Sequence, residues 1–380
     1  QFPWPRHSGA DVQLGKYDLG RSYIYATGMV VCHLPGSSDF HDRSRLQPSW
    51  RRLTGYLRSP TGDGKGCMTK YWIGRILQAL PLWLGASVLV FFVLQIAPGD
   101  PATILADPSF LTDQQLTELR ESIGLEDPLP VQYLKMMAGL VSGDLRSFRT
   151  QDPTTVMIVE ALPTTFSVVF VGVVVAVVIS LPVGVAAGQR PGSILDRVLS
   201  GGIVTVISLP AFVVALLLIR LFAEEWHLLP ASGIRSAGAT GYNPIDMAPH
   251  LILPALVTAL PLAPILARYT RDAVQDTLAE DFVRTAYAKG LAEKTVMRRH
   301  VLRNALVPVI SVVGILTPLL LGGTVIVEQL FSLPGIGRIT VQAALLRDYP
   351  VVMSTVLFSA LLVISANLIV DFLGISEQQI

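Results

Sequence analysis

The chain has 380 residues and a formal net charge of +1 at pH 7; 51% of its residues are hydrophobic and only 15% are charged. Soluble globular domains carry about 25% charged residues, so the composition argues against an ordinary soluble protein. Only two cysteines occur, Cys32 and Cys67, and a framework of disulfides is therefore not expected.

Residues 1–67 differ from the rest of the chain. They mix Pro, Gly, Ser and Arg with isolated aromatic residues, show no sustained apolar period and lack the pattern of a signal peptide. Such a segment buries too little apolar surface to offset the entropy that ordering costs. We therefore expect a disordered or non-native extension, the alternative being a cytosolic extension that binds a partner. A start at Met68 is expected, since a short basic lead follows it and Lys65-Gly66-Cys67 is what a translated ribosome-binding stretch would encode.

Six stretches without Asp, Glu, Lys or Arg are near or above the about 20 residues that cross a bilayer core. They are residues 76–97, 161–189, 198–219, 247–267, 304–327 and 351–370. Lipid leaves only helices or closed barrels as spanning structures, and these runs lack the alternating pattern of barrel strands. The sequence therefore predicts an all-α polytopic membrane protein with six transmembrane helices. Helix 1 lies in residues 68–97 and helices 2–6 in residues 161–373, followed by a tail at 374–380.

Residues 98–160, after the first span, are predicted to form an extracytoplasmic segment with short helices. Thr112 and Gln115 have the spacing of a capping box, which opens a helix that runs to about Ser122. A second short helix is expected at residues 131–141. The two helices could simply cap the bundle or form part of a docking platform for a soluble partner.

The basic residues are unevenly distributed. Residues 268–303 contain eight Lys and Arg, whereas residues 98–160 contain four against ten Asp and Glu. Basic loops stay in the cytoplasm, and the even number of spans then places both ends of the bundle inside. Residues 98–160, 220–246 and 328–350 are expected to lie outside.

Prolines and small residues recur inside the predicted spans, for example Pro182 and Gly184. Interior prolines bend helices and small residues let helices approach closely. We therefore favour a bundle that rocks between two openings over ordinary packing.

Arg220, Glu328 and Asp371 lie at span ends, where they can reach the membrane interface. A carrier driven by protons or sodium ions usually has an ionisable group inside the membrane. The six predicted spans contain no Asp, Glu, Lys or Arg, so the energy for transport is expected to come from elsewhere.

A basic segment at residues 268–303 separates the fourth and fifth spans. Residues 268–289 are predicted to form one helix that continues the fourth span, Gly290 to break it, and residues 291–302 to form a second helix. A helix–glycine–helix elbow with small residues at its bend would fit a partner's groove with little loss of side-chain entropy. The alternative is a solvated basic loop on the membrane surface.

The elbow carries a motif. Arg-Thr-Ala-Tyr-Ala-Lys-Gly-Leu at residues 284–291 and His-Val-Leu-Arg-Asn-Ala at residues 300–305 resemble the loop of permease subunits of binding-protein-dependent ABC importers, in the dipeptide, oligopeptide and nickel branch. The general motif of that family is Glu-Ala-Ala, three residues, Gly, nine residues and Ile-x-Leu-Pro. This chain departs from it, as the peptide branch does, at Arg284, Thr285, His300 and Arg303.

The resemblance extends over about residues 68–371. Further similar segments are residues 97–101, 124–133, 143–145, 328–331, 334–338 and 347–350. The chain lacks the family's usual Gly after Leu145 and its Asp-Pro-Arg tail, so an altered C-terminus is expected.

The resemblance implies the type I importer permease fold, with a cytoplasmic coupling helix between helices 4 and 5. Such a subunit sits in the lipid bilayer of the bacterial inner membrane with a second, similar permease, two ATP-binding subunits and an extracytoplasmic binding protein, and no nucleic-acid partner is expected. ATP and Mg²⁺ would be bound by the partner subunits.

The chain has no Gly-x-x-x-x-Gly-Lys-Ser/Thr loop, so we expect neither an enzyme nor a catalytic, cofactor or metal site. The residues expected to transmit force from the ATPases are Arg284, Thr285, Ala286, Ala288, Lys289, Gly290 and Leu291.

Several functions remain open at this point. Within the family, di- and oligopeptides are the expected substrates, followed by nickel chelates or glutathione-like compounds. A secondary carrier or channel would need an ion site inside the membrane. A membrane-embedded enzyme would need a motif such as His-Glu-x-x-His, which the chain lacks.

Overall fold

The computed structural model describes residues 64–105, 112–236, 238 and 243–377. The expectations for residues 1–63 and for the end of the tail, 378–380, lie outside the described residues. The chain divides into two units, Gln1–Cys67 and Met68–Ile380, and almost all described residues belong to the second.

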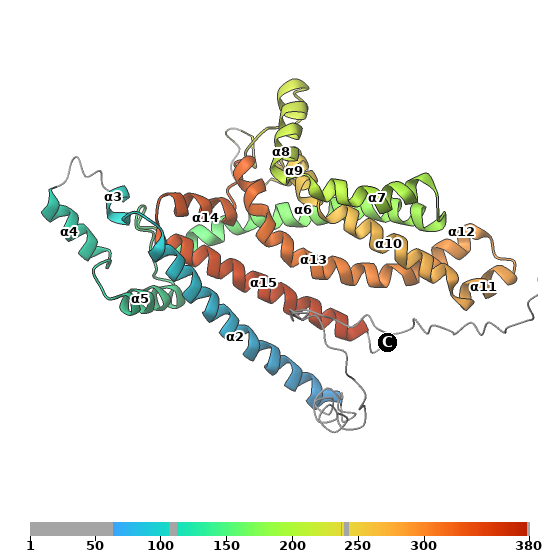
Figure 1. Cartoon of the computed structure of the whole chain (residues 1–380), viewed down its shortest axis with the longest axis horizontal. Helices are drawn as coiled ribbons and strands as arrows, with labels where there is room; N and C mark the ends of the chain where they lie inside the picture. Colours follow the sequence, from blue (N-terminus) through green and yellow to red (C-terminus); the bar gives the residue numbers. More distant parts are fainter. Residues whose placement is uncertain (1–63, 106–111, 237, 239–242, 378–380) are drawn as a thin grey trace, which may run out of the picture. The chain divides into compact units, whose positions relative to one another are not determined.

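Helices build the described part of the chain (Figure 1), which contains no β-strand, only an isolated bridge between Arg146 and Pro153. The α-helices are α2 Gly64–Ile96, α3 Pro101–Leu105, α4 Asp113–Ser122, α5 Leu129–Ser142, α6 Thr154–Gln189, α7 Ile194–Ser208, α8 Ala211–Leu218, α9 Pro244–Ala259, α10 Leu262–Ala279, α11 Asp281–Ala288, α12 Glu293–Val296, α13 Leu302–Leu330, α14 Ile336–Leu345 and α15 Tyr349–Glu377. Two π-helical stretches, η1 Ile219–Glu225 and η2 Met297–Val301, extend α8 and lead into α13. The all-α prediction is confirmed.

Four helices among the described residues are long and apolar enough to cross a membrane. They are Gly74–Ile96, Thr154–Gln189, Glu293–Leu330 and Tyr349–Val370. α9 and α10 pass the same test together but are bent by 60° at the break between them, so up to five spans are present. The predicted fourth span, 247–267, is therefore a bent pair of helices rather than one straight helix.

The predicted third span, 198–219, is interrupted. α7 ends at Ser208, and α8 begins at Ala211 directly after Pro210. A proline has no N–H to donate and disfavours a helical conformation in the residue before it, which accounts for the interruption. Neither helix is long enough to span alone, so the count of six transmembrane helices stays a prediction.

α6 packs closely against α9 and α10 because three of its residues are glycines. A Cβ atom on Gly172 would lie 2.7 Å from Cγ2 of Thr258, and one on Gly184 would lie 2.5 Å from the carbonyl oxygen of Ala267. A Cβ atom on Gly188 would also be too close to α10. The small residues of α6 thus allow the close helix approach that their pattern indicated.

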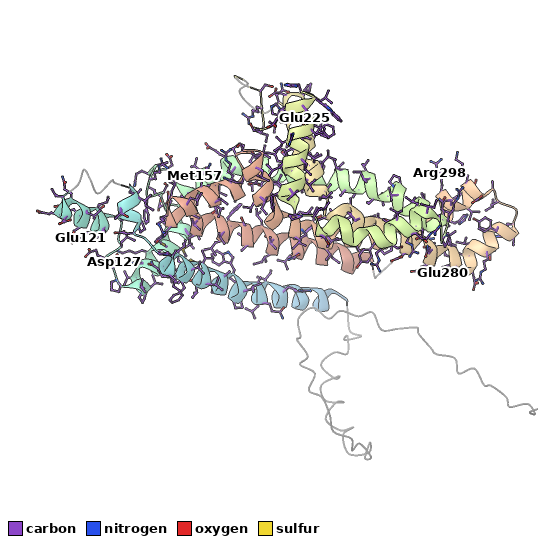
Figure 2. The ribbon with its side chains drawn as sticks, turned by 45° about the horizontal axis from the view of Figure 1, so that its top comes forward. Glu121, Asp127, Met157, Glu225, Glu280 and Arg298 are labelled. Atoms are coloured by element: carbon purple, nitrogen blue, oxygen red, sulfur yellow. The ribbon has the colours of Figure 1, made fainter. Side chains whose placement is uncertain are left out.

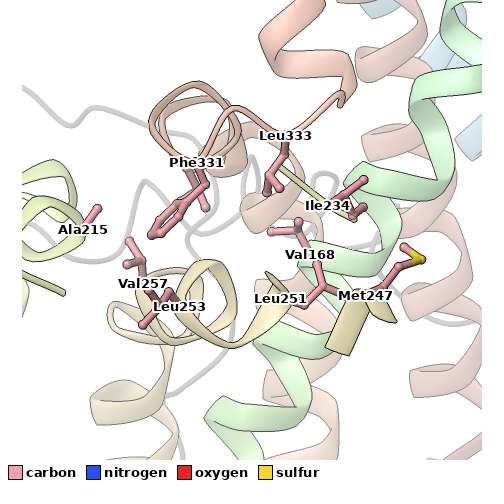
Figure 3. Packing of buried hydrophobic residues seen from close by; sticks show 10 residues of the cluster. Val168, Ala215, Ile234, Met247, Leu251, Leu253, Val257, Phe331 and Leu333 are labelled. Carbon is pink, nitrogen blue, oxygen red and sulfur yellow. The ribbon is translucent and has the colours of Figure 1, made fainter. Parts of the chain in front are cut away.

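The largest buried hydrophobic cluster joins α6, α8, α9 and the turn after α13. Figure 3 shows Val168 of α6 facing Leu251 of α9, with Phe331 and Leu333 of the turn on the other side of the cluster. Phe331 and Leu333 are almost completely buried. The cluster therefore fixes the end of α13 against the middle of α6.

Glu328 is completely buried, and the prediction that it reaches the membrane interface is wrong. One carboxylate oxygen accepts a hydrogen bond from Oγ1 of Thr165 at 2.9 Å, and the other accepts one from the backbone N–H of Arg338 at 3.1 Å. Oγ1 of Thr165 in turn accepts from the backbone N–H of Ile336 at 2.9 Å. The first turn of α14 folds over the carboxylate, which supplies the acceptors that free N–H groups at a helix N-terminus require.

The segment after α2 contains the short helices that were predicted. Thr112 and Gln115 form the capping box that opens α4, and α5 ends at Gly143 in a left-handed conformation with φ of 81°. α6 begins at Thr154, so helical structure extends into the predicted segment 98–160. The backbone N–H of Phe148 donates to Asp348 at 3.1 Å, which attaches this segment to the turn before α15.

Candidate functional site

The elbow, defined as residues 281–296, connects α10 to the long helix that ends as α13 (Figure 1). Figure 2 shows Glu280 and Arg298, which flank the elbow, at one end of the helices and Glu121 and Asp127 of the α4–α5 region at the opposite end. The elbow and the segment after α2 therefore lie at opposite ends of the helices, and their placement on opposite sides of a membrane stays a prediction.

The entry to the elbow differs from the prediction of one helix over residues 268–289. α10 ends at Ala279, Glu280 is extended with φ of −70° and ψ of 146°, and α11 starts at Asp281. The backbone oxygen of Glu280 accepts from the N–H groups of Val283 and Arg284 at 3.1 and 3.3 Å, so it begins a new helix. Asp281 adds a negative charge to the first turn, which favours a helix start.

Gly290 ends α11 in a Schellman motif. The N–H of Gly290 donates to the carbonyl oxygen of Tyr287 at 2.9 Å, and the N–H of Leu291 donates to that of Ala286 at 3.4 Å. This pattern requires a left-handed residue after the helix, and Gly290 has φ of 76°. The predicted break at Gly290 is thus found, although the next helix begins only at Glu293 and not at residue 291.

The inner face of the elbow is hydrophobic and fixed to its neighbours. Val283 and Ala286 of α11 are buried in a cluster with Val274 of α10 and with Val296 and Val301 of the following helix. Ala286 was predicted to transmit force from the ATPases, and its side chain faces inward into this cluster. Its place in the elbow is to hold α11 against α10.

The outer face carries the other six predicted residues, all exposed: Arg284, Thr285, Ala288, Lys289, Gly290 and Leu291. Phe282 and Tyr287 are 42% and 43% exposed on the same helix, and Leu291 is 39% exposed. Neither aromatic ring is among the residues that were predicted to transmit force. Their signal is their position, since each flanks the buried Val283–Ala286 stripe at helical spacing.

Charged groups also mark the outer face. Nη1 of Arg284 lies 3.2 Å from Oδ1 of Asp281, with both side chains largely exposed. An exposed pair of this kind adds little stability, so Arg284 can exchange its partner at small cost. Lys289, Lys294 and Arg298 are exposed as well and make the surface basic.

The described residues contain no group of three or more His, Cys, Asp or Glu side chains placed to hold a metal ion. The elbow itself presents an apolar and basic surface without a cluster of nucleophiles or carboxylates.

Two family profiles match the chain. Residues 180–374 match the binding-protein-dependent transport system inner membrane component, and residues 68–169 match the N-terminal region of such membrane components. The first profile includes the whole elbow.

Several proteins of known description are similar over most of their length. The chain is 39% identical to the oligopeptide transport system permease protein AppB of Bacillus subtilis over 308 residues, 80% of this chain and 97% of that protein. It is 36% identical to the glutathione transport system permease protein GsiC of Salmonella choleraesuis over 308 residues and 35% identical to the dipeptide transport system permease protein DppB of Escherichia coli over 328 residues, in both cases 80% of this chain and 96% of that protein. Among solved structures, the inward-facing MetNI methionine ABC transporter is similar with a TM-score of 0.43 and 21% identity, over 58% of this chain and 97% of that chain.

Proposed function

The chain belongs to the family of inner membrane components of binding-protein-dependent transport systems, in its dipeptide and oligopeptide branch, and on this basis we propose that it forms part of the pathway of an ATP-driven peptide importer. In this proposal a second, similar permease completes the pathway, and an extracytoplasmic binding protein delivers the substrate. Two separate ATPase subunits bind ATP and Mg²⁺, so this chain needs no cofactor and catalyses no reaction.

The elbow is the contact with an ATPase subunit. The observation that carries this assignment is its two-sided construction: Val283 and Ala286 are buried against α10, while Phe282, Tyr287 and Leu291 are exposed. Aromatic residues are enriched at the centres of protein interfaces. Because the inner face is packed, a displacement of the outer face by the ATPase would move α10 and the start of α13 with it.

Orientation follows from the same assignment. With the elbow in the cytoplasm and six spans, both ends of the helical bundle are cytoplasmic and the 98–160 segment faces outward. The α4–α5 region at the far end (Figure 2) then lies on the side from which a binding protein approaches.

The substrate class is assigned as di- and oligopeptides because two of the similar proteins are described as oligopeptide and dipeptide permeases. A glutathione-like substrate is the second candidate, since a glutathione permease is similar to almost the same degree. Nickel chelates remain a third. A secondary carrier or channel is less well supported, because both oxygens of the buried carboxylate of Glu328 are already engaged by Thr165 and Arg338.

The proposal is tested with the complex of this chain and its candidate partners in liposomes, using a labelled dipeptide and labelled glutathione as probes. Gly290→Trp should prevent co-purification of the ATPase and abolish ATP-dependent uptake, although the protein inserts normally. Gly238→Trp is a matched control, because Gly238 also has positive φ and no atom within 4 Å of an added Cβ. Normal uptake by Gly290→Trp would contradict the docking role of the elbow.

A further inference from the structure

An ion pair joins α7 to α10 next to the elbow. Nε of Arg271 lies 2.6 Å from Oδ1 of Asp196, and Nη1 of Arg271 lies 2.6 Å from Oδ1 of Asp272. The other carboxylate oxygen of Asp196 accepts a hydrogen bond from the backbone N–H of Gly192 at 2.7 Å. The side chains of Asp196 and Arg271 are 8% and 23% exposed. The hydrogen bonds from Arg271 and Gly192 hold the pKa of Asp196 below its ordinary value, so the pair is charged at neutral pH.

The arginine of this pair belongs to the same packed body as the elbow. Arg271 precedes Val274 by about one helical turn, and Val274 packs against Val283 and Ala286 of the elbow. The end of α6 is part of the body too, because a Cβ atom on Gly188 would lie 2.9 Å from the carbonyl oxygen of Arg271. The ion pair thus connects the start of α7 to α6, α10 and the elbow together.

Beside the ion pair, an apolar groove of about 470 Å³ is lined by residues of α6, α7, α8, α9 and α10. α7 contributes Leu195, Val198, Leu199 and Gly202 to its lining, and α10 contributes Ala263, Pro264 and Ala267. Apolar contacts are not directional, so the groove wall leaves α7 free to shift along α10. The ion pair has a defined geometry and restricts α7 and α10 near the start of α7.

The main chain connects the start of α7 to the end of α6 through residues 190–193, whereas its connection to α10 and the elbow is long. From the end of α7 at Ser208, the chain passes through α8, η1, α9 and α10 before it reaches α11 at Asp281. This route is interrupted at Pro210 and bent by 60° between α9 and α10. Movement of α10 and the elbow therefore reaches the start of α7 by two routes, the short connection from α6 and the side-chain contact of Arg271 with Asp196.

We propose that the Asp196–Arg271 ion pair is a positioning contact through which movement of the elbow is transmitted to α7. When an ATPase displaces the elbow and α10, the ion pair carries the start of α7 with them, while the apolar groove lets the rest of α7 move against α10. The inference rests on the proposed coupling role of the elbow. It adds α7 to the helices that respond to ATP.

A double-mutant cycle in the complete complex tests this role. Asp196→Asn and Arg271→Gln each leave one charge unpaired, whereas the double variant removes both charges and relieves that penalty. Arg268→Gln is the matched control, because Arg268 is on the same helix but is 64% exposed and lies 3.9 Å from Asp272. For each variant, the measurements are co-purification with the ATPase, ATP hydrolysis, and uptake of a labelled dipeptide per ATP hydrolysed.

The double variant should assemble and hydrolyse ATP like the unaltered complex, but its uptake per ATP should fall by about fivefold or more, within the usual range of coupling between sites. Arg268→Gln should couple normally. If the double variant couples normally, or fails to assemble, the pair only stabilises the fold and the inference is wrong. If the unaltered chain does not co-purify with an ATPase at all, the proposed function fails instead.

Discussion

Glu328 shows how a single side chain can organise the end of the helical bundle. Gly335 precedes α14 and makes no side-chain cap, so the first N–H groups of this helix need acceptors from elsewhere. Glu328 of α13 and Thr165 of α6 supply them to Arg338 and Ile336. Three helices therefore meet at one carboxylate of α13, and its burial is compensated by hydrogen bonds from α6 and α14.

We expect Glu328→Ala to destabilise the protein strongly and Glu328→Gln mildly. Alanine leaves buried N–H and O–H donors without acceptors, at about 1–3 kcal/mol for each, and creates a cavity. Glutamine keeps an acceptor and nearly the same volume. Thermal unfolding of the purified protein in detergent should rank the alanine variant well below the glutamine variant, and an unfolding temperature of the alanine variant equal to that of the unaltered protein would contradict this role.

The helix break at Gly290 was predicted from the sequence and the burial of Glu328 was not, and the difference has a physical reason. A glycine after an amphipathic helix ends it through hydrogen bonds within six residues, so the signal is local. The surroundings of Glu328 are assembled from Thr165 and from the start of α14, which lie far apart in the chain. Position at the end of an apolar run gave no indication that α14 would fold over this carboxylate.

At the scale of elements, apolar runs identified helices better than they identified helix ends. α6, α13 and α15 contain the predicted runs 161–189, 304–327 and 351–370. The breaks at Glu280 and between Ser208 and Ala211 were not predicted, because a polar or apolar stripe can continue across a short break without changing period. Proline at 210 was visible in the sequence, but prolines also occur inside intact helices here, as Pro163 and Pro182 do in α6.

The elbow provides a comparison of two alanines two residues apart. We expect Ala286→Leu to loosen α11, because Ala286 is 4% exposed and its cluster has little room for three more carbon atoms. Overpacking of this kind costs about 1–3 kcal/mol. Limited proteolysis with trypsin, which can cut after Arg284 and Lys289, should become several-fold faster. Ala288→Leu is the matched control, since Ala288 is exposed; equal cleavage rates for the two variants would contradict the inward placement of Ala286.

A second comparison concerns the contact of α6 with α10. Gly184→Ala should lower the unfolding temperature, because even one methyl group would lie 2.5 Å from the carbonyl oxygen of Ala267. Gly201→Ala should raise it slightly or leave it unchanged, because nothing lies within 4 Å of a Cβ there and alanine favours a helix. Differential scanning fluorimetry of both variants in detergent measures the difference, and equal effects would mean that this helix contact is looser than described.

For the molecule as a whole, the remaining question is how many times the chain crosses the membrane. Four or five spans follow from helix length and composition, and six were predicted from the sequence. The difference lies in α7 and α8, which either cross together as a broken helix or enter and return on the same side. Single cysteines decide between these alternatives when Cys32 and Cys67 are replaced by serine. Suitable exposed positions are Glu118, Arg190, Glu224 and Lys289.

We expect a membrane-impermeant maleimide to label Glu118→Cys and Glu224→Cys in intact spheroplasts, and Arg190→Cys and Lys289→Cys only after permeabilisation. This pattern follows if α7 and α8 cross as one broken span, because Arg190 and Glu224 then lie on opposite sides. Equal behaviour of Arg190→Cys and Glu224→Cys in intact spheroplasts, with both labelled or neither labelled, would instead mean that α7 and α8 form a re-entrant pair. A broken helix can cross despite its break because the freed backbone groups find partners within the protein. Ala215 of α8 is buried in the cluster with Phe331, Leu253 and Val257, which attaches α8 to α9 and to the turn after α13.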